Sequence, residues 1–171
     1  MARTPSNMLP LMTPAPDFKL INTVNDEMLS LSDLKGEKGT VIFFVCNHCP
    51  FVIHVNHELV NIANDYRAKG IGFAAISSND VVNYPDDSPE LMKKVAVQQN
   101  YPFPYLYDET QEVARAYDAA CTPDIYVFDK DLRLVYRGQL DDSRPRNDIP
   151  VTGKDLRSAL DSLLYGQPIS E

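Results

Sequence analysis

The chain has 171 residues, enough for one domain with a sizeable core, and its 44% apolar and 23% charged residues are an ordinary globular balance. Its net charge of −8 argues against nucleic acid and against an anionic membrane surface as partners, because both attract clustered Lys and Arg. No run reaches the roughly 18 apolar residues of a membrane span, and the N-terminus has no apolar signal segment, so we expect a cytoplasmic protein.

The first half of the chain predicts strands alternating with a helix. The expected elements are an irregular Pro-rich segment at 1–16, short strands at 17–21 and 28–31, a turn at 32–36, a strand at 40–45, a helix at 50–69 and a strand at 71–77. The run at 40–45 is apolar almost throughout, which is typical of a central strand buried on both faces. Pro50 suits the first turn of the following helix, and Gly70 suits its end.

The second half predicts further helices and a hairpin. The expected elements are a polar loop at 79–89, a helix at 90–99, a strand at 105–107, a helix at 109–119, strands at 124–129 and 132–137, a polar loop at 141–150 and a helix at 152–165. Parallel crossovers followed by an antiparallel hairpin indicate an α/β fold, with a mixed central sheet, helices on both faces and an N-terminal β extension. We expect a single domain over residues 17–168.

The most informative motif is Cys46-Asn47-His48-Cys49-Pro50, between the buried strand and the helix. Unpaired N–H groups and the helix dipole stabilise a thiolate at a helix N-terminus. We expect Cys46 to be the attacking thiol at an exposed turn, and Cys49, one turn into the helix, to be the resolving thiol. A protonated His48 would stabilise the thiolate further and make the pair more oxidising.

A zinc site is the alternative interpretation of the two cysteines. It needs two more ligands, and the candidates are Cys121, His48, His54 and His57. We expect His54 and His57 to be solvent-exposed, because they lie opposite the apolar face of their helix. The sequence favours redox chemistry over zinc, and no metal is expected.

Cys121-Thr122-Pro123 is the second candidate site, at a junction between a helix and a strand. The Thr122–Pro123 bond is a candidate cis bond, and this turn would pack beside the two cysteines, where its backbone could pair with an extended substrate. The alternative is that Pro123 is an ordinary trans residue opening a strand and that Cys121 is a small buried filler. The loop at 141–145 either closes over the site or is a solvated charged loop, which is the commoner case.

Five motifs together resemble a known group of proteins. They are Cys46-Asn47-His48-Cys49-Pro50, Ile76-Ser77-Ser78-Asn79-Asp80, Tyr101-Pro102-Phe103-Pro104-Tyr105-Leu106, Cys121-Thr122-Pro123-Asp124 and Arg137-Gly138-Gln139-Leu140-Asp141-Asp142-Ser143-Arg144-Pro145. The chain resembles the small bacterial, thioredoxin-like redoxins with Cys-Asn-His-Cys, grouped with the alkyl hydroperoxide reductase/thiol-specific antioxidant (AhpC/TSA) family. The resemblance implies a thioredoxin fold with a cis proline at Pro123. It also implies thiol–disulfide oxidoreductase or antioxidant activity through a redox-active disulfide of Cys46 and Cys49, with no other cofactor.

The chain departs from the patterns of its relatives at three points. Val45 stands where thioredoxins usually have Trp before the first cysteine, and residues 40–45 hold no buried carboxylate. Peroxiredoxins carry Pro-x-x-x-Thr-x-x-Cys, and neither cysteine here has Thr three residues before it, since those positions are Phe43 and Cys46. The missing carboxylate leaves no evident base for Cys49, and the missing Thr hydroxyl, which would orient a peroxide, weakens the peroxidase interpretation.

Three functions follow from these observations. The first is an oxidoreductase that acts on protein or small-molecule disulfides and draws electrons from a thioredoxin- or glutathione-type donor. The second is a thiol peroxidase, with Cys46 attacking a peroxide and Cys49 or Cys121 resolving. The third is a non-enzymatic metal-binding or docking module.

Overall fold

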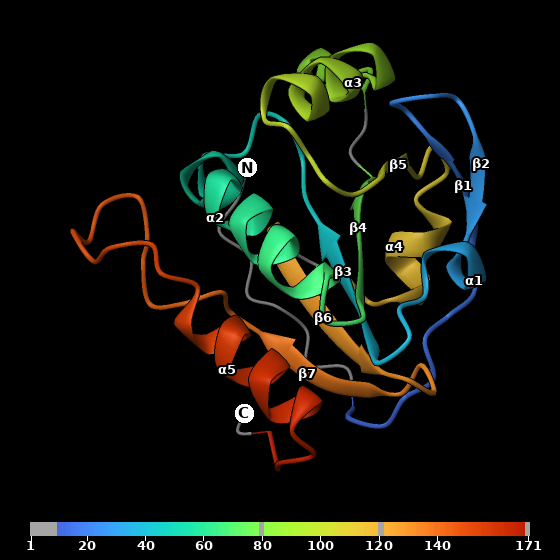
Figure 1. The fold of residues 1–171 in the computed structure, drawn as a ribbon. Coiled ribbons are helices and arrows are strands. Elements are labelled where there is room, and N and C mark those ends of the chain that lie inside the picture. The colour runs from blue at the N-terminus through green and yellow to red at the C-terminus, as the bar shows by residue number, and fades with distance from the viewer. Residues whose placement is uncertain (1–9, 79–80, 120–121, 170–171) are drawn as a thin grey trace.

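The computed structural model describes residues 10–78, 81–119 and 122–169 and contains one seven-stranded sheet, in the order β2-β1-β5-β4-β3-β6-β7 (Figure 1). The strands are β1 (Lys19–Asn22), β2 (Met28–Ser30), β3 (Gly39–Phe44), β4 (Ile71–Ser77), β5 (Tyr105–Tyr107), β6 (Asp124–Asp129) and β7 (Leu134–Gly138). β3, β4 and β5 run parallel, while β6 and β7 form an antiparallel hairpin at one edge and β1 and β2 extend the other. This is the mixed sheet with an N-terminal extension that the sequence predicts.

The central strand β3 is buried at every position, because helices cover both faces of the sheet. Its side chains alternate between two hydrophobic cores. Val41 and Phe43 pack in the core that also contains Cys46 and Cys49, while Ile42 and Phe44 pack in the core on the opposite face. A continuous apolar run such as this one is the pattern expected of a strand with no solvent-facing side.

The helices are α1 (Leu31–Leu34), α2 (Pro50–Arg67), the 3₁₀ turn η1 (Pro85–Asp87), α3 (Pro89–Gln98), α4 (Glu112–Ala116) and α5 (Lys154–Leu164). Side chains of α2, α3 and α5 enter the first core, and those of α1 and α4 enter or flank the second. Figure 1 shows α2 and α5 side by side, and Tyr66 of α2 donates a hydrogen bond to Asp161 of α5 at 2.7 Å. In the part of the chain described, no helix is both long and apolar enough to cross a membrane.

Two helices differ from the prediction because single residues at their N-termini determine where they begin. The expected turn at 32–36 is the short helix α1, which begins after Ser30 because Ser30 and Asp33 form a reciprocal capping box. The helix expected at 109–119 is shortened to α4 because Gln111 adopts a left-handed conformation, with φ of 65°. Gly153 is the N-cap of α5.

The register of three strands brings distant loops together at one edge of the sheet. Phe44 at the end of β3 pairs with Ile76 near the end of the parallel strand β4. Phe44 also pairs with Asp124, the first residue of the antiparallel strand β6. Segments that follow β3 and β4 and the segment that precedes β6 therefore meet, and this edge carries both motifs that the sequence analysis singled out.

Candidate active site

The Cys46–Cys49 loop joins β3 to α2 and lies deeper than expected. Cys46 is 1% exposed and Cys49 is 0% exposed, so the expectation of an exposed Cys46 is wrong. Cys49 is the N-cap of α2 and does not lie one turn into it, because the helix begins with Pro50 at its first position. The N-terminus of α2 therefore lies at Cys49 and not at Cys46.

The two thiols are free and interact with each other. A hydrogen bond from the Cys46 thiol is the main cause that lowers the pKa of Cys49 from 9.0 to about 5, helped by Thr122 and by the amide groups of Val52 and Phe51, against the effect of burial. The same hydrogen bond, together with burial, raises the pKa of Cys46. The negative charge of the reduced pair therefore lies on Cys49.

Thr122 and Pro123 lie against both sulfur atoms. The Thr122–Pro123 peptide bond is cis, as the resemblance implies. The Thr122 hydroxyl is 3.6 Å from Cys46 Sγ, and the Thr122 carbonyl oxygen is 3.5 Å from Cys49 Sγ. The expectation that this turn packs beside the two cysteines is confirmed for these two residues, while Cys121 lies outside the described part of the chain.

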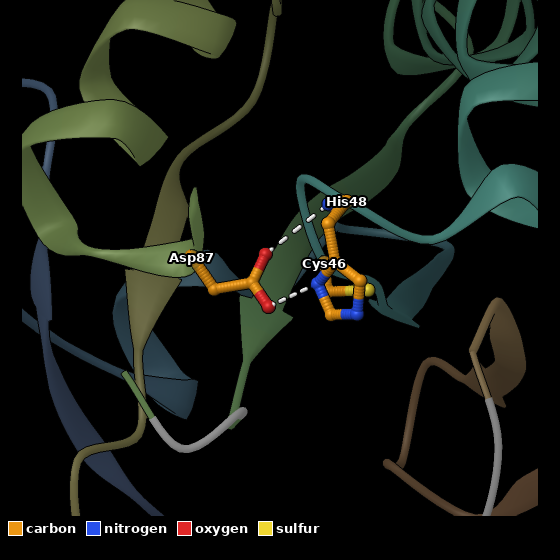
Figure 2. A group of neighbouring side chains, drawn as sticks. All are labelled: Cys46, His48 and Asp87. Carbon is orange, nitrogen blue, oxygen red and sulfur yellow. Dashed lines mark hydrogen bonds and ion pairs between the residues drawn. The ribbon is translucent and has the colours of Figure 1, made fainter. Parts of the chain in front are cut away.

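Asp87 is a site residue that the sequence analysis missed. It lies in η1, in the expected polar loop, and its carboxylate is 0% exposed. Its Oδ1 accepts hydrogen bonds from the backbone N–H groups of Asn47 at 2.8 Å and His48 at 3.2 Å. Its Oδ2 lies 2.5 Å from Nδ1 of His48 (Figure 2). The parallel register of β3 and β4 was the available signal, since loops after neighbouring parallel strands meet at the same edge.

The remaining residues of the loop are also held from outside it. Asn47 donates from its amide to the carbonyl oxygen of Asp86 at 2.8 Å and accepts a hydrogen bond from the Tyr105 hydroxyl at 2.9 Å. The ring of His48 stacks on Tyr84, with 4.7 Å between the centroids. Contacts from η1 and from β5 thus fix both residues that separate the cysteines.

The residues proposed for the zinc alternative do not gather into one site within the described ranges. Among the described residues, one group of three possible metal ligands lies close together. It consists of Cys46, His48 and Asp87, whose ligand atoms are within 4.8 Å of one another. His57 is exposed as expected, but His54 is half-buried, because its Nε2 forms a hydrogen bond of 2.7 Å with Ser143.

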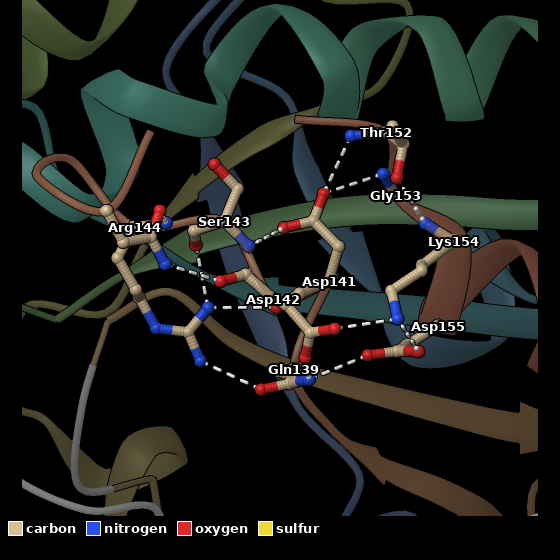
Figure 3. Close-up of polar contacts among 10 residues, drawn as sticks. Gln139, Asp141, Asp142, Ser143, Arg144, Thr152, Gly153, Lys154 and Asp155 are labelled. Carbon is tan, nitrogen blue, oxygen red and sulfur yellow. Dashed lines mark hydrogen bonds and ion pairs between the residues drawn. The ribbon is translucent and has the colours of Figure 1, made fainter. Parts of the chain in front are cut away.

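The loop between β7 and α5 has an internal structure of its own (Figure 3). Asp141 is 1% exposed, and its carboxylate accepts hydrogen bonds from the backbone N–H groups of Ser143, Thr152 and Gly153. Ser143 is also buried, whereas Asp142 forms an exposed ion pair with Lys154 at 2.7 Å. The loop is therefore partly buried, and its carboxylates anchor the start of α5.

Comparison with solved structures identifies two close relatives. An uncharacterized conserved protein from Geobacillus kaustophilus is 64% identical, with a TM-score of 0.95, 97% of this chain covered and 88% of that one. A hypothetical protein from Sinorhizobium meliloti 1021 is 41% identical, with a TM-score of 0.94, 96% of this chain covered and 90% of that one. A comparison with curated proteins finds no match to this chain.

A more distant structure shows the fold. The thioredoxin domain of a thiol-disulfide oxidoreductase from Bacteroides vulgatus is 19% identical, with a TM-score of 0.65, 77% of this chain covered and 90% of that one. The seven-stranded sheet with helices on both faces is therefore a thioredoxin fold with additional strands. The model of the AhpC/TSA family matches residues 11–137, which include the two cysteines, Asp87 and the Thr122–Pro123 turn. The chain therefore belongs to the AhpC/TSA family.

Proposed function

We propose that the chain is a thiol–disulfide oxidoreductase in which Cys46 attacks a disulfide and Cys49 resolves the mixed disulfide. The observation that carries the proposal is the position of both sulfur atoms beside the Thr122–Pro123 turn, with Cys46 Sγ 3.6 Å from the Thr122 hydroxyl and Cys49 Sγ 3.5 Å from the Thr122 carbonyl oxygen. A reactive thiolate with a second thiol in contact is the arrangement that thiol–disulfide exchange requires. Membership of the AhpC/TSA family and the thioredoxin fold support thiol redox chemistry in general.

The reaction consists of two exchanges at sulfur. Cys46 forms a bond with one sulfur of the substrate disulfide, and the other substrate sulfur leaves as a thiolate. The Cys49 thiolate then attacks the Cys46 sulfur, closes the protein disulfide and releases the second substrate thiolate, so that two electrons pass to the substrate. The two free sulfur atoms must approach each other for this second step.

The substrates we propose are protein or small-molecule disulfides, and a thioredoxin- or glutathione-type donor reduces the oxidised pair back to the dithiol. No cofactor besides the redox-active disulfide is part of the proposal. The low pKa of Cys49 stabilises the reduced form about 100-fold at pH 7 relative to a thiol with a pKa of 9.0. This corresponds to a reduction potential about 60 mV less negative than that of the same pair with ordinary thiols.

The test is reduction of insulin, with dithiothreitol as the terminal reductant. We expect the Cys46→Ser and Cys49→Ser variants to lose the activity and the Cys121→Ser variant to keep it. Equilibration in glutathione buffers, with thiol trapping and mass spectrometry, measures the potential of the pair. A Cys46→Ser variant as active as the wild type, or the absence of a disulfide between Cys46 and Cys49, would overturn the proposal.

A thiol peroxidase is the second candidate, and membership of the AhpC/TSA family is the observation that favours it. In this reaction Cys46 would attack a peroxide and become a sulfenic acid, which Cys49 or Cys121 would convert to a disulfide. Stopped-flow mixing of the reduced protein with hydrogen peroxide is the measurement. A rate no higher than that of a free thiolate would exclude this candidate.

A further inference from the structure

One ring nitrogen of His48 is buried and has no hydrogen-bond partner among the described residues. Nδ1 lies 2.5 Å from the Asp87 carboxylate, which can only accept hydrogen bonds when ionised, so Nδ1 carries the proton of the neutral ring. Nε2 then holds a lone pair, and it is the Nε2 atom that is buried without a partner. A buried lone pair of this kind is a ready proton acceptor.

The Cys46 thiol is an acidic group on the same loop. Cys46 Sγ, a ring nitrogen of His48 and a carboxylate oxygen of Asp87 lie within 4.8 Å of one another, and Figure 2 shows the three side chains converging. A ring nitrogen within 4.8 Å of the sulfur places the imidazole within reach of a proton transfer bridged by one water molecule. The transfer would solve a chemical difficulty, because Cys46 shares its proton with Cys49 and lies near the charge of Asp87, and both raise its pKa.

We propose that His48 accepts the proton of Cys46 when Cys46 attacks, and that Asp87 is the positioning residue that holds the ring for this transfer. The inference rests on the proposed function and adds a base to it. The Cys46 proton moves to His48 Nε2, the Cys46 sulfur bonds to one substrate sulfur, and the leaving substrate thiolate takes the proton from His48. Cys49, already a thiolate, then resolves the mixed disulfide without a base.

The surroundings of His48 suit this role. Tyr84 covers one face of the ring, and the carboxylates of Asp87 and Asp86 lie in the same 3₁₀ turn, η1. The thiol groups of Cys46 and Cys49 are the other titratable groups of the loop. The buried Asp87 carboxylate lies against the ring, so the charge that forms on His48 during the transfer is balanced within the site.

The experiment isolates the attack by Cys46. In the full-length Cys49→Ser, Cys121→Ser protein, treated with a chelator, Cys46 is the remaining thiol, and its reaction with 5,5′-dithiobis(2-nitrobenzoate) releases one chromophore. The rate is measured by stopped flow from pH 6 to pH 9. We expect the rate of this parent protein to level off within the range, because His48 takes the proton.

Adding His48→Gln should lower the rate about 100-fold at pH 7. The rate should then rise about tenfold per pH unit without levelling, because ionisation of Cys46 then depends on hydroxide. Adding Asp87→Asn keeps an oxygen for the backbone N–H groups but removes the carboxylate that holds Nδ1, and we expect it to lower the rate at which the profile levels off. His57→Gln is the matched control, since His57 is exposed on α2, the helix that follows the loop, and it should leave the profile unchanged.

The outcomes separate the two proposals. A parent that reacts and levels off, with a His48→Gln profile of the same shape and height, would overturn the inference and leave the proposed function standing. A parent that does not react, with a Cys46→Ser, Cys121→Ser protein that does, would overturn both, because Cys49 would then be the attacking thiol. Circular dichroism and urea unfolding of each variant show whether it is folded, and the shape of the pH profile is read on folded variants.

Discussion

The ionisation of Cys49 depends on its neighbour, and this dependence can be measured directly. The hydrogen bond from Cys46 is the largest of the causes that bring the pKa of Cys49 from 9.0 to about 5. The full shift corresponds to about 5 kcal/mol, and at pH 7 it makes Cys49 about 99% thiolate instead of about 1%. Cys46→Ala removes the donor, so most of the shift should disappear and the pKa of Cys49 should move back toward 9.

Thiolate absorbance at 240 nm during a pH titration of the reduced protein is the assay. The wild type and the Cys121→Ala control should show one thiolate with a midpoint near pH 5, and Cys49→Ala should lack it. Cys46→Ser should fall between the wild type and Cys46→Ala, because a hydroxyl still donates a hydrogen bond. A midpoint near 5 that persists in Cys46→Ala would refute the assignment of the shift to this hydrogen bond.

Three further predictions concern stability. The pKa of Cys49 is lower in the folded state than its ordinary value of 9.0, so the free energy of unfolding of the reduced protein should rise from about pH 5 to pH 9 and fall as the pH drops through 5. Urea unfolding under a phosphine reductant measures this, and a profile that Cys49→Ala leaves unchanged would contradict it. Arg137→Met removes the guanidinium that lies 2.7 Å from the buried Asp124 carboxylate and should cost about 3–5 kcal/mol. Lys154→Met removes an exposed ion pair and should change stability little; equal losses for the two variants would count against this explanation. Gly72→Ala should destabilise the fold by about 1–3 kcal/mol or more, because the new Cβ would lie 2.2 Å from the carbonyl oxygen that ends α1, and an unchanged melting temperature would show that α1 moves freely.

The buried strands were predictable from sequence because burial on both faces leaves a continuous apolar run. The expected ranges 71–77, 105–107 and 124–129 coincide with β4, β5 and β6. The short helices were less accessible, because their extent depends on single residues. A capping box at Ser30 creates α1, and the left-handed Gln111 delays α4.

The site residues whose types indicate redox chemistry were predictable from the sequence. The residue that belongs to the site only through its position in the fold was missed. Cys46, Cys49 and the Thr122–Pro123 turn stood out by composition and came together as expected. Asp87 lies 40 residues after Asn47, in a polar loop without a pattern, and its contacts become visible only in the structure. The exposure of Cys46 was predicted wrongly because its burial depends on the segments that cover it from elsewhere in the chain.

Because the side chains of β3 alternate between the two faces of the sheet, the sheet separates two hydrophobic cores. Only one of these cores contains Cys46 and Cys49. Phe43 and Phe44 are consecutive, of the same type and almost fully buried, yet Phe43 lies on the side of Cys46 and Cys49 and Phe44 on the other. Phe43 contacts the rings of Phe73 and Phe103, whereas Phe44 lies against Tyr117 and Tyr126 on the far side. Substitutions in the core on the far face can therefore lower the stability of the protein without changing the surroundings of the two thiols. Stability and redox properties are thus free to change separately.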